Sequence, residues 1–137
     1  MRGQMYYELA ADTWGVEEKT AIQEVVESGR FTMGPRVAQF EQAFAEYFGR
    51  KHAVMVNSGS SANLVALTAF GFKPGDEVIT PACTFSTVLA PLVQLGVKPV
   101  FVDVLLDAYV PSVEAVLAAV TERTVMIWLP NLVGSKP

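Results

Sequence analysis

A run of small polar residues at positions 57–63 is the clearest candidate for chemistry in this sequence. The segment NSGSSAN follows the apolar stretch 53–56 and precedes an apolar run that begins at Leu64. This pattern predicts a corner between a buried strand and a helix, and the first turn of a helix presents unpaired N–H groups and a partial positive charge. Because small residues let an anion approach these N–H groups, and serine hydroxyls add donors, residues 58–61 are a candidate phosphate site.

The same residues also have an ordinary structural interpretation. Serine and asparagine are common helix caps, and glycine is common in turns. The segment matches neither a Walker loop nor a dinucleotide fingerprint. On composition alone the structural interpretation is the better one, so the phosphate hypothesis needs support from another part of the chain.

The segment TPACTFST at 80–87 provides that support, because it too follows an apolar strand and opens a helix. Both segments are therefore expected at the carboxyl edge of one parallel sheet, where ligands bind in α/β proteins. Phe85 could stack there on a flat heteroaromatic ring, although packing in the core is the commoner arrangement for phenylalanine. Asp103 ends a further strand and could be catalytic, but a capping or solvent-facing role is favoured.

Helical and strand patterns alternate along the chain and would position these segments. Apolar spacing and turn residues predict helices at 16–28, 35–48, 61–70, 84–95 and 112–120, with Pro91 disturbing the fourth, and strands at 53–56, 77–80, 99–104 and 125–129. Leu64, Leu67 and Phe70 are expected to face inward. The strands are nearly continuous apolar runs, which indicates a mostly parallel sheet with helices on both faces. We expect one N-terminal portion of an α/β domain, with a helix and loop at 1–34 and the α/β unit at 35–137.

Composition excludes several classes of protein. The 137 residues suffice for one domain, and 51% hydrophobic with 18% charged residues argues against disorder. A net charge of −4 gives no footprint for nucleic acid. Cys83 is the only cysteine, so no disulfide or metal site is expected, and a cytoplasmic location fits. Residues 1–8 lack the apolar core of a signal peptide, and charges interrupt the apolar region 88–106, so no membrane span is expected.

Three stretches together resemble the DegT/StrS sugar-nucleotide aminotransferases, which are pyridoxal-phosphate enzymes of fold type I. The first covers residues 13–67 and includes VNSGSSANL. The second is KPGDEVITPACTFSTVLAPLVQLGVKPVFVDV at 73–104, and the third is NLVGSKP at 131–137. The resemblance spans nearly the whole chain, and the spacing between the stretches also agrees. It implies part of the large domain of such an enzyme, without its later strands.

The resemblance assigns roles to matched residues. It implies that Ser60 and Ser61 hold the phosphate of pyridoxal 5'-phosphate through amides and hydroxyls, and that Phe85 stacks on the pyridine ring. The loop 30–34, through Arg30, Phe31 and Met33, would lie near the dimer interface and the substrate entrance. The role of Asn131, near a position where the family often has a polar residue, stays open.

The resemblance leaves three functions open. The first is an aminotransferase of amino-sugar and lipopolysaccharide biosynthesis that takes a keto sugar nucleotide, with glutamate as the expected amino donor, and acts as a homodimer. The second is a dehydratase of the same family, which removes a 3-hydroxyl and has His in place of the Schiff-base lysine. The third is a non-catalytic fragment.

The catalytic lysine is not expected in this chain. None of its lysines, at positions 19, 51, 73, 98 and 136, has the context of the family's Schiff-base lysine. Family members are much longer, and their first strand lies apart from the next three, with later strands between. We therefore expect an incomplete sheet that is poorly stable alone or needs a partner, or a rearranged compact unit of three or four strands.

Overall fold

The computed structural model describes residues 11–136, so the prediction about residues 1–8 lies outside the described residues. The described chain forms two compact units, one ending at Met55 and one beginning at Val56. Among residues 11–136, no helix combines the length and the apolar character that crossing a membrane requires.

The first unit contains two helices whose ends are set by local sequence. Helix α1 is Val16–Ser28, and the Glu18 carboxylate accepts a hydrogen bond from the Gly15 N–H at 2.7 Å. Gly29 follows in a left-handed conformation, with φ of 66°, as a helix-ending glycine should. Helix α2 is Pro35–Tyr47 and starts with proline, which has no N–H to leave unpaired. Both helices confirm the prediction.

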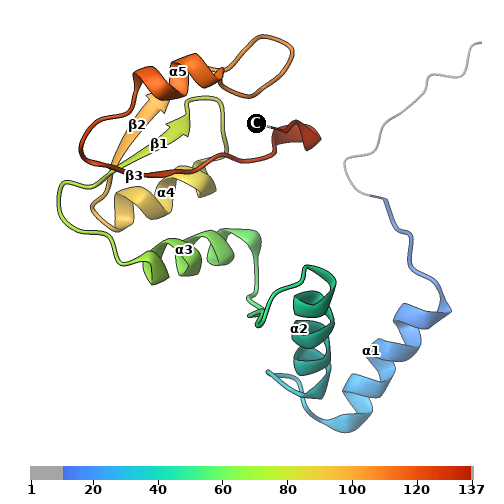
Figure 1. Ribbon diagram of the computed structural model, residues 1–137. Helices are drawn as coiled ribbons and strands as arrows, with labels where there is room; N and C mark the ends of the chain where they lie inside the picture. The colour runs from blue at the N-terminus through green and yellow to red at the C-terminus, as the bar shows by residue number, and fades with distance from the viewer. Residues whose placement is uncertain (1–10, 137) are drawn as a thin grey trace, which may run out of the picture. The chain divides into compact units, whose positions relative to one another are not determined.

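The second unit is built on a parallel sheet (Figure 1). Its strands are β1 Glu77–Pro81, β2 Lys98–Val102 and β3 Thr124–Ile127, in the order β2-β1-β3. In register, Ile79 of β1 lies between Val100 of β2 and Ile127 of β3. The central strand is buried at every position. These strands confirm the predicted α/β class, with small shifts at their ends.

Helices cover the sheet of the second unit. They are α3 Gly59–Phe70, α4 Ser86–Gln94 and α5 Val113–Ala118, followed by a short 3-10 helix at Leu132–Gly134. Figure 1 shows α4 and α5 on opposite sides of the strands. The core lies between the sheet and the pair α3 and α4, and its buried residues are Leu67, Val78, Leu92 and Val97.

Two predictions, one at the end of the first unit and one in helix α3, are wrong. Residues 53–56 form no strand, and Val54 is 73% exposed, because no neighbouring strand pairs with this segment in the described chain. Of the three α3 residues expected to face inward, only Leu67 is buried, whereas Leu64 and Phe70 are 36% and 50% exposed. The packed face of α3 is narrower than its apolar pattern suggests.

Candidate functional site

Helix α3 begins with a capped first turn that leaves donors free. Ser58 is the N-cap, and its hydroxyl oxygen accepts a hydrogen bond from the Ser61 N–H at 3.2 Å. The Ser58 hydroxyl also donates to the Ser61 hydroxyl at 3.1 Å. The amides of Gly59 and Ser60 are in the first turn and have no carbonyl partner within the helix. Of the two amides predicted to hold a phosphate, that of Ser61 is thus already used by the cap.

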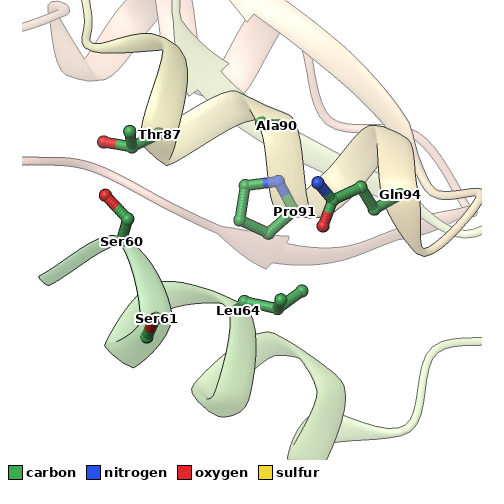
Figure 2. A pocket seen from close by; sticks show the side chains of 7 residues that line it. All are labelled: Ser60, Ser61, Leu64, Thr87, Ala90, Pro91 and Gln94. Atoms are coloured by element: carbon green, nitrogen blue, oxygen red, sulfur yellow. The ribbon is translucent and has the colours of Figure 1, made fainter. Parts of the chain in front are cut away.

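A shallow pocket of about 260 Å³ lies between α3 and α4. Figure 2 shows Ser60 of α3 and Thr87 of α4 facing each other across one end of it. Its lining is mainly apolar further along, and the full set is Ser60, Ser61, Leu64, Thr87, Ala90, Pro91 and Gln94. The pocket contains no charged side chain, so only hydroxyls, amides and the helix dipole would attract an anion there.

Phe85 lies at the start of α4 but not in this pocket. It is the N-cap residue of α4, in an extended conformation, and the whole residue is 65% exposed. The ring is therefore free to be covered by a ligand or by another part of a protein. The structure does not bring it into the lining that contains Ser60 and Ser61, so its stacking role stays a prediction.

Asp103 follows β2 and makes a local contact. Its carboxylate accepts a hydrogen bond from the Val104 N–H at 2.9 Å, and its side chain is exposed. This agrees with the capping role that the sequence favoured over a catalytic one.

Two threonine hydroxyls near the carboxyl end of β1 were missed by sequence reasoning. Among the described residues, the buried side-chain oxygens of Thr80 and Thr84 have no hydrogen-bond partner. Thr80 lies in the strand and is completely buried, and Thr84 precedes Phe85 in the following loop. Leaving a buried hydroxyl unpaired costs free energy. The hydrogen bonding at the carboxyl edge of the sheet is therefore incomplete among the described residues. No pattern in the sequence distinguishes these threonines from ordinary strand and loop residues.

The amino end of β1 carries a buried carboxylate that the sequence also did not reveal. Glu77 is 1% exposed, and its Oε1 accepts hydrogen bonds from Lys98 Nζ at 3.0 Å and from Arg123 Nη2 at 2.8 Å. Its Oε2 accepts one from the Thr121 hydroxyl at 2.6 Å. The bond from Thr121, then that from Lys98, lowers the pKa of Glu77 from 4.5 to about 2, with Arg123 adding to them against the opposing effect of burial. This cluster lies at the end of β1 opposite Thr80, and its bonds join β1 to β2 and to the turn before β3.

The loop between α1 and α2 belongs to the first unit. Its residues Phe31 and Met33 are 71% and 75% exposed, and Arg30 is also exposed. Such exposed apolar side chains are compatible with an interface, and their expected role at a dimer interface or substrate entrance stays a prediction.

The start of α3 fits a phosphate group. A Cβ added to Gly59 would meet no atom within 4 Å, so there is open space beside the free amides. The Ser60 side chain is exposed. Small residues, free helix amides and open space are what a phosphate monoester needs. The fold and this site are compatible with an α/β protein that binds a phosphorylated cofactor at the carboxyl edge of its sheet.

The chain belongs to the DegT/DnrJ/EryC1/StrS aminotransferase family, which residues 12–136 match. A GDP-4-keto-6-deoxy-D-mannose 3-dehydratase of Yersinia pseudotuberculosis is 44% identical over 135 residues, which cover 94% of this chain and 34% of that protein. A protein of the same name from Escherichia coli O55:H7 is also 44% identical and is covered to 35%. The chain therefore spans about a third of the length of these relatives.

Solved structures agree with this assignment. The E. coli GDP-4-keto-6-deoxy-D-mannose 3-dehydratase with bound hydrated pyridoxal phosphate superposes with a TM-score of 0.84 at 44% identity. The match covers 89% of this chain and 33% of that structure. The fold is that of part of a fold type I enzyme, and pyridoxal phosphate is the cofactor of the family. Its members related to this chain are sugar-nucleotide enzymes.

Proposed function

We propose that this chain forms the phosphate-binding part of a pyridoxal-phosphate-dependent sugar-nucleotide 3-dehydratase. The observation that supports the reaction is the 44% identity, over 94% of the chain, to a GDP-4-keto-6-deoxy-D-mannose 3-dehydratase. The relatives thus favour the dehydratase, which the sequence analysis had placed second, over the aminotransferase. The substrate class in either case is a keto sugar nucleotide.

The residues of this chain would bind and orient the cofactor. The amides of Gly59 and Ser60 and the Ser60 hydroxyl would donate hydrogen bonds to the phosphate, while Ser58 holds the Ser61 amide and keeps the first turn of α3 in place. Phe85 would lie against the pyridine ring. When bound, the cofactor supplies an electron sink for breaking bonds next to the sugar carbonyl. We assign the role of catalytic base to none of the described residues.

The binding role is tested with the 137-residue chain and pyridoxal 5'-phosphate. Binding is followed by cofactor fluorescence, with inorganic phosphate as competitor. We expect Ser60→Ala to weaken binding about ten-fold or more, because hydrogen bonds to charged groups contribute more than neutral ones. Ser28→Ala, at the end of α1, is the matched control and should bind normally. Wild-type and Ser60→Ala chains of equal affinity would refute the phosphate site.

The reaction is tested with the polypeptide purified from the cells that make it, supplied with GDP-4-keto-6-deoxymannose, cofactor and glutamate. A dehydratase expels the 3-hydroxyl as water, and oxidation of an electron donor, here glutamate, supplies the two electrons with which hydrogen takes its place. Mass spectrometry of the nucleotide sugar detects the net loss of one oxygen atom. An aminotransferase instead yields a sugar in which an amino group replaces the keto oxygen. The second product would restore the aminotransferase as the function.

Several features of the assembly are part of the same proposal. We place the exposed loop residues Arg30, Phe31 and Met33 at a homodimer interface beside the substrate entrance. For the alternative aminotransferase we propose glutamate as the amino donor, and for either enzyme we propose a cytoplasmic location. Analytical ultracentrifugation of Phe31→Asp would test the interface, because a charge there should shift a dimer toward monomers.

A further inference from the structure

Helix α4 contains a proline in its interior, and this proline creates an acceptor on its surface. Pro91 is buried in α4 and has no N–H. In an α-helix the N–H of residue 91 would bond to the carbonyl of residue 87. The Thr87 carbonyl therefore lacks its usual donor within α4.

The missing donor is provided by the neighbouring helix. Asn63 of α3 donates a hydrogen bond from its side-chain Nδ2 to the Thr87 carbonyl oxygen at 3.2 Å. Asn63 is partly buried and lies one turn after Ser60. Thr87 itself lines the pocket opposite Ser60 (Figure 2). The proline and the asparagine are thus complementary, since one creates the acceptor that the other uses.

This bond joins the two helix starts on which the site depends. The buried core that α3 and α4 share is apolar and includes Leu67 and Leu92. Apolar packing is not directional, whereas a hydrogen bond to a single carbonyl fixes how far one helix can slide along the other. The bond lies near Ser60, at the end of the helix pair where both helices begin. Its acceptor, the Thr87 carbonyl, is two residues after Phe85.

We propose that Asn63 is a positioning residue, which holds the phosphate-binding start of α3 at a set distance from the start of α4 by bonding to the carbonyl that Pro91 leaves free. This inference rests on the proposed function, because the site that Asn63 positions is the cofactor site. Asn63 does not line the pocket, so it acts through the placement of Ser60 and of the first turn of α4.

The test is a double-mutant cycle with Asn63→Leu, which is similar in size but has no donor, and Pro91→Ala, which restores the helix N–H. Urea unfolding and pyridoxal phosphate affinity are measured for all four chains. In the wild-type background we expect Asn63→Leu to weaken cofactor binding about five-fold, the equivalent of one neutral hydrogen bond. In the Pro91→Ala background the same change should have a much smaller effect, because α4 then satisfies the Thr87 carbonyl itself. Equal effects in both backgrounds would overturn the proposal.

A core variant separates positioning from general destabilisation. Val97→Ala removes buried volume from the same core without touching the pocket. It should lower the urea midpoint and leave cofactor affinity unchanged. If Val97→Ala and Asn63→Leu weaken binding equally, the asparagine has only a structural role. If the wild-type chain itself does not bind the cofactor, the proposed function fails; if the wild type binds and Asn63→Leu binds equally well, the positioning role alone fails.

Discussion

The two ends of strand β1 differ in how completely their polar groups are satisfied. At the amino end, Glu77 is buried and accepts hydrogen bonds from Lys98, Arg123 and Thr121, which come from β2 and from the turn before β3. At the carboxyl end, the hydroxyls of Thr80 and Thr84 are buried without a partner among the described residues. Among the described residues, neighbouring side chains thus satisfy the polar group at the amino end of β1, whereas the polar groups at its carboxyl end stay without a partner.

The amino end of β1 therefore has a structural role, and the carboxyl end is where we propose a function. The cluster around Glu77 ties the starts of three strands together through both oxygens of a buried carboxylate. The opposite edge presents free helix amides at α3, an exposed aromatic ring at Phe85 and unpaired hydroxyls. A parallel sheet directs its strand ends and helix starts to this edge, where ligands are bound. The incomplete edge is thus where we place the cofactor.

Removing the carboxylate of Glu77 should have the largest effect. Glu77→Ala leaves Lys98 and Arg123 without their acceptor and opens a space in the sheet, so we expect the largest fall in urea midpoint of the variants proposed here. Glu122→Gln, in the exposed turn beside Arg123, is the matched control and should unfold like wild type. A Glu77→Ala chain as stable as wild type would remove the contrast between the two ends of β1.

Acid should weaken the amino end selectively. The pKa of Glu77 is lowered from 4.5 to about 2 in the folded chain, chiefly by the bonds from Thr121 and Lys98. A lowered folded-state pKa contributes stability that is present above the unfolded-state value and is lost as pH falls toward the folded-state value. Urea midpoints of wild type should therefore fall between pH 4.5 and about 2 more steeply than those of Glu77→Gln. Parallel curves for the two chains would contradict the shift.

Two serine caps allow a matched comparison within the second unit. Ser58 caps α3 and Ser112 caps α5, and each accepts a hydrogen bond from the amide three residues later, at 3.2 Å and 3.1 Å. Replacing either with alanine should cost about 1 kcal/mol of stability. Only Ser58→Ala should also weaken pyridoxal phosphate binding, because it disorders the proposed phosphate site. An equal loss of binding in Ser112→Ala would mean that affinity follows stability alone.

Phe85 should show the smallest effect on folding. The residue is 65% exposed, so Phe85→Leu should change the free energy of unfolding by no more than about 0.5 kcal/mol. The same change should measurably lower affinity for pyridoxal phosphate but not for inorganic phosphate, which has no ring to stack. Unchanged affinity for both ligands would remove Phe85 from the site.

Features set by neighbouring residues in the chain were predictable. Gly29 marks the end of α1 and Pro35 the start of α2, since capping and proline geometry depend on a few adjacent residues. The exposed corner before α3 was predictable for the same reason. The strand expected at 53–56 was wrong, because a strand also requires a partner, and apolar residues do not reveal whether one is present.

The amino-acid sequence alone determined the alternation of helices and strands, the parallel class of the sheet and the family, because these depend on local patterns and on motifs at fixed spacing. Only the tertiary structure decided which polar groups meet. It brought Lys98 and Arg123 onto Glu77, and it placed the Asn63 amide on the carbonyl that Pro91 leaves free. Such contacts join residues more than twenty positions apart, and their geometry depends on how the strands and helices pack rather than on any segment by itself.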